Sequence, residues 1–348
     1  MSLRQAQPVR ATIRDVAARA GVSVSSVSRV MNGEPHISPE LHARIMRAVN
    51  HLRFEPHSAA QALRSRESKT IGCMVADLSN PLYSEMINGA EEEFQRAGYV
   101  LMLAATRHEQ DRETAFVSAV RRRRMDGLLL FAGDNAHTDF TGALANLDLP
   151  CVAIDREVPG VPSVRADHRG GGLEITRYLI GLGHRRIGLV IGPLSLSTMA
   201  DRAQGYRQGL AQGGIAFDPE LVGQVDLQEA TAQRVVGDLM RLADPPTAVI
   251  GCNDLTTIGA MRGLRELGLR VPEDVSLIGF DDVIGGDLMD PPLTVIQQPV
   301  FEIGCRAVDV LIARIDDPMA PRIDVALPTR LVVRASTASP ASHARGEV

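Results

Sequence analysis

Near the start of the chain, apolar positions recur every three or four residues in three short blocks, which predicts three helices. The apolar stripes are Ile13, Val16, Ala17 and Ala20, then Val27, Val30 and Met31, then Leu41, Ile45, Val49 and Leu52. Thr12 and Asp15 can form a capping box at the first helix, and Gly21 can end it. Ser23 and Ser38 stand where the next two helices need N-caps. This order of elements is typical of a helix-turn-helix module.

The second predicted helix has an outward face of short side chains and one arginine. With its apolar stripe turned inward, it exposes Val24, Ser25, Ser28 and Arg29. Short side chains let a helix approach base edges, valine methyls can pack on thymine, and arginine can bind guanine through two hydrogen bonds. The face indicates DNA recognition, and the alternative is a three-helix packing module without a ligand.

Further along, short apolar runs alternate with helical patterns. The predicted strands are Thr70–Ala76, Tyr99–Ala105, Gly127–Ala132, Cys151–Asp155, Arg186–Gly192, Ala248–Cys252 and Val275–Phe280. The predicted helices are Leu82–Ala97, Gln110–Arg124, Gly170–Leu182, Met199–Gln212, Glu229–Leu242, Leu255–Leu267 and Phe301–Ile315. Such alternation is typical of parallel sheets covered by helices on both faces. We therefore expect an all-α headpiece followed by an α/β body of two doubly wound parallel-sheet subdomains.

Polar side chains follow many of the predicted strands. They are Asp77, Asn80, Arg107, Asp155, Asp226, Asn253, Asp254, Asp281 and Asp282, with Arg202 and Gln298 nearby in the pattern. One such residue is usually only a helix cap, as we expect for Asp254. Because ligands of open parallel sheets lie beyond the carboxyl ends of the strands, the whole set indicates a cleft of donors and acceptors that suits a polyol.

Charge separates the two parts of the chain. The net charge is -5, but residues 1–69 carry eleven Arg or Lys and five Asp or Glu, a net charge of +6 that leaves -11 for the rest. A small basic part on a large acidic body indicates that only the small part meets a polyanion, unless the imbalance is an ordinary variation of surface charge.

Composition narrows the class of protein. The 348 residues, 45% hydrophobic and 23% charged, are ordinary for a globular chain of two or three domains. We see neither a membrane-spanning run nor a secretory signal at the N-terminus. Cys73, Cys151, Cys252 and Cys305 lie far apart in the sequence, so we expect them to be reduced, in a cytoplasmic protein.

The chain carries no motif that would indicate an enzyme. It contains no GxxxxGK[ST], no GxGxxG after a strand, no HExxH and no GxSxG. Gly170, Gly171 and Gly172 look like the start of a helix, and the adjacent Asp281 and Asp282 should point apart. The nine histidines do not cluster at metal-ligand spacing. We expect no enzymatic activity, no metal and no cofactor.

The run TIRDVAARAGVSVSSVSRVMNG, followed by ISPELHARIMRAVNHLRFEPHSAAQALRS, resembles the headpiece and hinge of the LacI/GalR family of bacterial transcription regulators. The resemblance implies a headpiece in the major groove, with Val24, Ser25 and Arg29 reading bases. It also implies a hinge helix in which Leu63 wedges a base step open from the minor groove. His57 and Arg64 depart from the family pattern. The candidate DNA contacts are Thr12, Val24, Ser25, Ser28, Arg29, Asn32, His57, Ala60 and Leu63.

Body segments such as DLSNPLYSEMINGAEEEFQRAGY, DRAQGY, PTAVIGCND and VPEDVSLIGFDD resemble the effector-binding domain of the same family, which is similar to periplasmic sugar-binding proteins. The resemblance implies three chain crossings, near residues 167, 298 and 326. The implied effector contacts are Asn80, Tyr83, Arg107, Asp155, Arg202, Asp226, Asn253, Asp281 and Gln298.

These comparisons predict the boundaries of the domains. We expect a disordered segment 1–11, a headpiece 12–56, a hinge 57–69, an effector-binding and dimerisation domain 70–337, and a disordered tail 338–348. The first subdomain would comprise about 70–167 and 299–326, and the second about 168–298 and 327–337.

The effector is expected to be a sugar or a sugar acid. Asp155, Asp226 and Asp281 suit hydroxyl groups, whereas Arg107 and Arg202 suit a carboxylate or a phosphate. A purine-type or other effector is the alternative. The family often has an aromatic ring where this chain has Asp226, and Tyr83 could offer one face for stacking.

Together, the two parts predict a sequence-specific, effector-controlled transcription regulator, in the simplest case a repressor. It would bind a pseudo-palindromic double-stranded operator as a homodimer, and the effector would alter the angle between the subdomains. The alternatives are a sugar-binding protein without a regulatory role, such as a periplasmic one, and a sugar-modifying enzyme.

Overall fold

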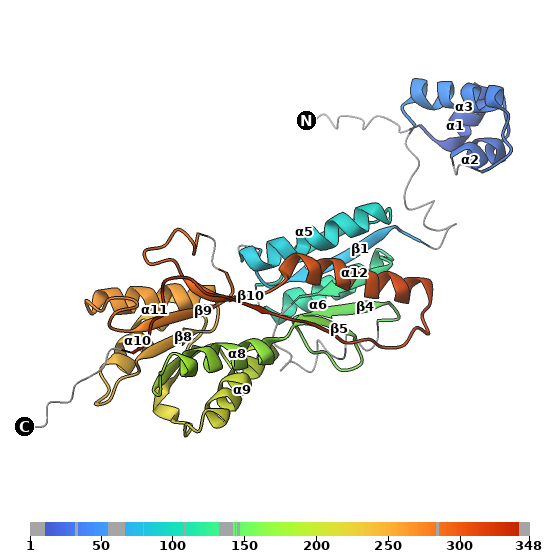
Figure 1. Cartoon of the computed structure of the whole chain (residues 1–348). Helices are drawn as coiled ribbons and strands as arrows, with labels where there is room; N and C mark the ends of the chain where they lie inside the picture. The colour runs from blue at the N-terminus through green and yellow to red at the C-terminus, as the bar shows by residue number, and fades with distance from the viewer. Residues whose placement is uncertain are drawn as a thin grey trace, which may run out of the picture. The chain divides into compact units, whose positions relative to one another are not determined.

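The computed structural model of the chain comprises two units, residues 1–68 and 69–348 (Figure 1). It describes residues 11–31, 34–54, 67–78, 80–107, 109–131, 142, 144, 147–282 and 285–340. None of the helices in these ranges is long and apolar enough to cross a membrane.

The first unit contains the three predicted helices, α1 (Ile13–Ala20), α2 (Val24–Met31) and α3 (Pro39–Leu52). Thr12 and Asp15 form the expected capping box, and Gly21 ends α1 in the left-handed conformation with φ of 63°. The Ser38 side chain accepts the backbone N–H of Leu41 at the start of α3. All three helices contribute to one core, which includes Val16, Val27 and Ile45 and which Ala11 also contacts.

The first subdomain of the body is built on a six-stranded parallel sheet of order β11-β5-β4-β3-β1-β2. Its strands are β1 (Thr70–Val75), β2 (Val100–Ala105), β3 (Gly127–Leu130), β4 (Cys151–Ile154), β5 (Ser163–Ala166) and β11 (Val325–Leu327). Helices α5 (Pro81–Arg96) and α12 (Val300–Asp316) pack together against one core cluster of the sheet. Helix α6 (Gln110–Arg122) belongs to a second cluster with Met74, Leu128 and Leu130.

The second subdomain has the same plan, with sheet order β12-β10-β9-β8-β6-β7. Its strands are β6 (Ile187–Ile191), β7 (Val222–Gln224), β8 (Ala248–Gly251), β9 (Ser276–Phe280), β10 (Thr294–Gln297) and β12 (Arg330–Val332), and a short 3-10 helix, η1 (Pro219–Leu221), precedes β7. Helices α8 (His168–Gly181) and α9 (Ser197–Gln212) belong to one core cluster, and α10 (Glu229–Met240) and α11 (Asp254–Glu266) to the other. The prediction of two α/β subdomains is confirmed.

One strand departs from the predicted parallel order, because β12 runs antiparallel to β10. The chain passes between the two sheets after β5, after β10 and between β11 and β12. Strand β10 leaves the second sheet toward the first subdomain, whereas β12 enters the second sheet from it. The two neighbours must therefore point in opposite directions.

Helices α8 and α9 approach each other backbone to backbone. A Cβ added at Gly172 would lie 2.5 Å from the carbonyl oxygen of Arg202, and one at Gly205 would lie 2.2 Å from that of Arg169. The glycine run 170–172 is thus part of a helix, as predicted, and the close contact fixes the backbone at Arg202.

The C-terminal segment is fixed further than we expected. The backbone of Ala338 bonds to the side chains of the buried His184 and Ser276, so the predicted disorder from residue 338 is wrong for that residue. Residues 341–348 lie outside the described ranges.

Candidate functional sites

The outward face of α2 carries three of the side chains that we predicted there. Val24, Ser25 and Arg29 are exposed, and the Ser23 hydroxyl caps the helix by accepting the Ser26 N–H at 3.1 Å. Ser28 is buried, with 6% of its surface exposed, so its predicted exposure is wrong. It lies about 100° around the helix from the buried Val27, and the inward face of α2 is wider than its apolar stripe.

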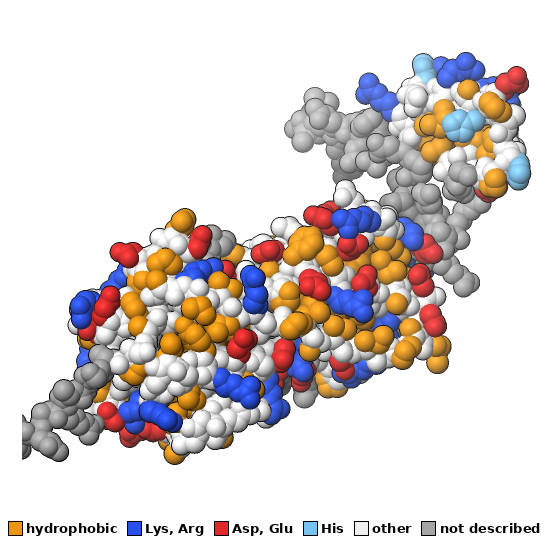
Figure 2. All heavy atoms as spheres, in the orientation of Figure 1, with side chains coloured by type: hydrophobic (Ala, Val, Ile, Leu, Met, Phe, Trp, Pro, Cys, Tyr) orange, Lys and Arg blue, Asp and Glu red, His pale blue; other side chains and the backbone are white. Residues whose placement is uncertain are grey.

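The one arginine on this face, Arg29, is paired with an acidic side chain. Arg29 Nε donates to Glu34 Oε2 at 3.0 Å, and both side chains are about half exposed. The Thr12 side chain is held in its capping box, and the hydrogen bonds from Thr12, first its backbone N–H and then its hydroxyl, lower the pKa of Asp15. Blue basic side chains are visible on this unit in Figure 2, and all of them are arginines, because residues 1–68 contain no lysine. The other predicted contacts, Asn32, His57, Ala60 and Leu63, lie outside the described residues.

In the body, five buried polar side chains form a connected cluster between the two sheets. We call Asp155, His168, Arg202, Asp281 and Gln298 the cleft network. Asp155, Asp281 and Gln298 follow the carboxyl ends of β4, β9 and β10, where ligands of such sheets bind. Four of the five were predicted from the sequence. His168 was missed, because the strand that precedes it, β5 (Ser163–Ala166), was not predicted either.

The network runs continuously from one subdomain to the other. Asp155 Oδ1 lies 2.9 Å from His168 Nε2, and His168 Nδ1 accepts from Arg202 Nη2 at 3.2 Å and from Nε at 3.3 Å. Arg202 Nη2 lies 3.6 Å from Asp281 Oδ1, which also accepts a hydrogen bond from Gln298 Nε2. These contacts account for the burial of four ionisable side chains in one place.

Arg202 is held on every side. Its Nη1 donates to the carbonyl oxygen of Cys252, and its guanidinium carbon lies 3.8 Å from the centre of the Phe280 ring. Burial raises the pKa of Asp155, but contact with His168 and the charge of Arg202 outweigh burial, so this pKa lies below its ordinary value. The charged form of Asp155 is therefore stabilised by both His168 and Arg202.

Residues with a strained backbone follow the carboxyl ends of β2, β4 and β9. Arg107, Asp155 and Asp281 have φ of 56°, 49° and 76°. Non-glycine residues rarely adopt positive φ, and such strain is common at binding sites. Three of the predicted effector contacts thus share this feature.

Tyr83 and Asn80 lie at the start of α5 and differ in the contacts that their side chains make. The Tyr83 ring packs edge-on against Phe131, with 5.9 Å between centroids, and burial followed by the charges of Asp155 and Asp281 raises its pKa. Tyr83 therefore lies near the cleft network. The Asn80 side chain caps α5 by accepting the Leu82 N–H at 3.0 Å.

The carboxyl group of Asp254, at the start of α11, has a place and a pKa that differ from those of a helix cap. Asn253 caps this helix, and Asp254 is its first residue, which corrects the prediction that Asp254 is the cap. Burial, and then the charge of Asp281, raise the pKa of Asp254 to about 7. Asp254 Oδ1 and Gln298 Oε1 are buried and accept no hydrogen bond from the described residues.

Two of the predicted effector contacts, Asp226 and Arg107, are exposed and make no contact with the cleft network among the described residues. Asp226 is exposed, and its carboxylate accepts the backbone N–H of Gln228. Arg107 is exposed and has no side-chain hydrogen bond to the described residues. Asp282 points away from Asp281, as predicted, and binds Arg334 at 2.8 Å.

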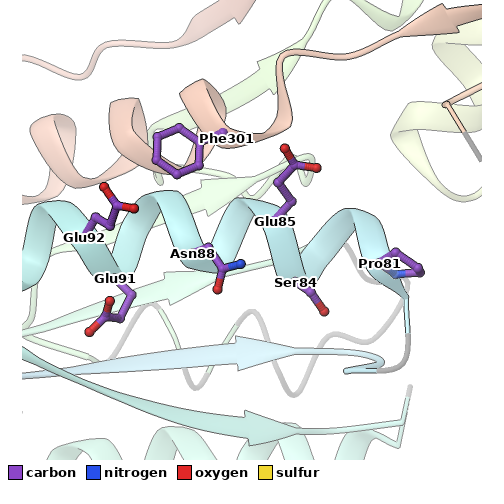
Figure 3. Close-up of a pocket in the computed structure, with 7 residues that line it drawn as sticks. All are labelled: Pro81, Ser84, Glu85, Asn88, Glu91, Glu92 and Phe301. Atoms are coloured by element: carbon purple, nitrogen blue, oxygen red, sulfur yellow. The ribbon is translucent and has the colours of Figure 1, made fainter. Parts of the chain in front are cut away.

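A separate depression lies on the outer side of α5, next to the first turn of α12 (Figure 3). Its volume is about 720 Å³, and it is open to solvent. The lining residues are Pro81, Ser84, Glu85, Asn88, Glu91, Glu92 and Phe301. None of them belongs to the cleft network.

Comparison with known proteins matches both units. Residues 12–57 match the family model described as "Bacterial regulatory proteins, lacI family", and residues 176–337 match "Periplasmic binding protein-like domain". The ribose operon repressor of Haemophilus influenzae is 34% identical over 312 residues, which cover 88% of this chain and 93% of the repressor. The chain belongs to the LacI family. The HTH-type transcriptional repressor PurR of Aliivibrio salmonicida is 32% identical over 88% of this chain and 93% of its own.

Solved structures of LacI-family regulators have the same fold. The Lac repressor dimer bound to operator and the anti-inducer ONPF has a TM-score of 0.85 and 27% identity, covering 94% of this chain and 99% of its own. The transcriptional regulator CelR in complex with cellobiose has a TM-score of 0.73 and 30% identity, covering 94% and 100%. The chain is a DNA-binding transcription regulator controlled by a small-molecule effector, and it is not an enzyme.

Proposed function

We propose that this LacI-family regulator is a repressor that reads a pseudo-palindromic operator through α2 of two subunits and responds to a hydroxylated sugar held by the cleft network. The observation that carries the first half is the exposed Val24, Ser25 and Arg29 on a capped helix of a basic unit. Its place of action would be the cytoplasm, where the operator lies.

Base reading by Arg29 requires that it leave Glu34. An exposed ion pair contributes only about 0.2–1 kcal/mol, so a bidentate contact with guanine can replace it. Val24 would pack on thymine methyl groups and Ser25 would bond to bases or phosphates. By the family resemblance, Thr12, Asn32, His57 and Ala60 would add contacts, and Leu63 would enter the minor groove.

The homodimer would use the edge of the first sheet. Strand β2 is an edge strand whose Val100, Met102 and Leu103 are exposed, Val100 to 64%. A row of exposed apolar side chains on an edge strand favours pairing with another surface. Two-fold pairing there would place two headpieces on one operator.

The effector would be a neutral sugar, because the cleft network offers acceptors more readily than free cations. Every nitrogen of Arg202 already has a partner, so a carboxylate or phosphate would have to displace Asp281 or the carbonyl oxygen of Cys252. Asp254 Oδ1 and Gln298 Oε1, which accept no hydrogen bond from the part of the chain that the structure describes, would instead accept hydrogen bonds from hydroxyl groups. Asn80, Tyr83, Asn253 and, from further out, Arg107 and Asp226 would complete the site.

The names of the relatives support a sugar as the effector, and they leave a purine as the alternative effector. One is named a ribose operon repressor and one solved neighbour holds cellobiose, whereas another relative is named PurR. Against a purine stands the edge-on packing of Tyr83 on Phe131.

The test is a thermal-shift screen of the full chain with ribose, cellobiose, gluconate, ribose 5-phosphate and hypoxanthine. A ligand at one hundred times its Kd stabilises the native state by about 2.7 kcal/mol. We expect a neutral sugar to raise the melting temperature, and an effect confined to gluconate, the phosphate or hypoxanthine would contradict the neutral-sugar proposal. Operator binding is read separately, by fluorescence anisotropy with DNA selected from a random pool.

A further inference from the structure

His168 stands at the first crossing between the subdomains and contacts both of them. It is the first residue of α8, directly after β5 and Asp167, and only 1% of its surface is exposed. Its Nε2 bonds to Asp155 of the first subdomain, and its Nδ1 bonds to Arg202 of the second. A second side-chain hydrogen bond across this boundary, from Arg165 to Asp201, is partly open to solvent.

The partners of His168 determine which tautomer of its ring fits the structure. Because a guanidinium can only donate, Nδ1 must be an acceptor, and the ring hydrogen must therefore lie on Nε2 and be donated to Asp155. We call this chain of hydrogen bonds the bridge. In it, Arg202 donates to the imidazole of His168, and the imidazole donates to Asp155.

Both partners are rigid, so the width of the ring fixes the distance between them. Asp155 is held by its strained backbone and by the Ala166 N–H, which it accepts at 3.2 Å. Arg202 is held by Phe280 and by the close approach of α9 to Gly172. The imidazole also lies against Phe280, with 5.9 Å between ring centroids.

We propose that His168 is a positioning residue that sets the separation of the two subdomains and passes a change at the effector site on to that separation. Both ring nitrogens of His168 are already bonded to Asp155 and Arg202, so within the cleft network it acts through these two residues and not by its own contact with an effector. The link to an effector rests on the proposed function, whereas the control of separation does not.

Three substitutions divide the bridge into its halves. His168→Asn places an amide oxygen near the position of Nδ1 and keeps the acceptor for Arg202, but it cannot reach Asp155. His168→Gln places an amide N–H near the position of Nε2 and keeps the donor for Asp155, but it loses Arg202. His168→Phe fills the volume and loses both. The matched control is His184→Phe, because His184 is equally buried but bonds to Thr247 and Ala338 within the second subdomain.

The measurement is the distance distribution between spin labels on the two subdomains, by pulsed electron paramagnetic resonance, without DNA or effector. The labels replace the exposed Arg122 of α6 and Arg234 of α10 by cysteine, with Cys305→Ser removing the partly exposed native thiol. Labelled protein is diluted with unlabelled protein so that only distances within one chain contribute.

We expect one narrow distribution for the unsubstituted chain and for His184→Phe, and a second distance population in all three His168 variants. A purely stabilising role would lower the melting temperature and leave the distribution unchanged, which would overturn the proposal. An unchanged distribution in either His168→Asn or His168→Gln would also overturn it, because one half of the bridge would then suffice. None of these results depends on whether DNA or a sugar binds.

Discussion

At the scale of single residues, the outward face of α2 and the start of α11 each lead to a substitution with a measurable result. Arg29 is exposed and paired with Glu34, whereas Asp254 has a pKa raised to about 7.

Arg29→Ala should relax operator specificity at one guanine. The bidentate contact discriminates bases by about 1–3 kcal/mol, so operators altered at that position should bind the variant as well as the original does. Fluorescence anisotropy over a set of single-base operator variants measures this. Arg44→Ala, which removes another exposed arginine of the headpiece, serves as the control and should weaken all operators alike. A uniform loss for Arg29→Ala would make Arg29 a phosphate contact.

Asp254→Asn should stabilise the protein at neutral and basic pH. The pKa of Asp254 is raised from 3.8 to about 7 in the folded chain, so the folded state holds its proton more tightly than the unfolded state does. The unsubstituted protein therefore loses stability relative to the variant as pH rises from about 4 to about 7, and the difference is constant above that.

Thermal unfolding between pH 4 and pH 9 measures the difference. Asp238→Asn, at an exposed position of α10, is the control and should show no such trend. A gap between Asp254→Asn and the unsubstituted chain that widened toward acid pH would contradict the assignment.

The outward positions of α2 could be predicted from the sequence, and several buried positions could not. Val24, Ser25 and Arg29 follow from the three-residue apolar stripe that defines the outward face of this helix. Ser28, Asp254 and His168 could not be placed, because their burial depends on which helices and strands pack beside them.

At the scale of elements, the long helices and the central strands could be predicted, and the crossing strands could not. Strands β10, β11 and β12 have three or four residues, too few for a periodic pattern to be recognised. Their pairing depends on where the chain leaves one sheet and enters the other. The antiparallel β12 is therefore a consequence of connectivity and not of local sequence.

The contact between α8 and α9 gives a prediction for an element. Gly205→Ala would place a Cβ 2.2 Å from the Arg169 carbonyl oxygen and 2.7 Å from the Leu173 nitrogen, so the helices must separate. Overpacking of this kind costs about 1–3 kcal/mol, and the shift would also displace Arg202 from His168.

Chemical denaturation measures the change in the free energy of unfolding. Gly181→Ala, in the last turn of α8 with nothing within 4 Å of the added methyl group, is the matched control and should be neutral or slightly stabilising. Equal changes in the free energy of unfolding for Gly205→Ala and Gly181→Ala would show that α8 and α9 separate without a loss of stability, which would contradict the prediction.

At the scale of the whole molecule, the edge of the first sheet should control both assembly and DNA binding. Val100→Glu would place a charge in the proposed dimer interface and so favour monomers. A monomer has one headpiece in place of two, so operator affinity should fall as the fraction of dimer falls.

Sedimentation velocity and anisotropy on the same samples measure the two effects. Met319→Glu, at an exposed apolar position outside the sheets, is the control and should change neither. A Val100→Glu protein that remained dimeric would place the interface elsewhere.

The discontinuity of each subdomain has a consequence for biosynthesis. The core of the first subdomain needs Ile303, Ala307 and Leu311 of α12, although its first strand begins at Thr70. A ribosome must therefore translate almost the whole chain before that core can close, whereas the headpiece has a core of its own, complete by Phe54. For most of its synthesis, the nascent chain carries a folded headpiece without a finished body to regulate it.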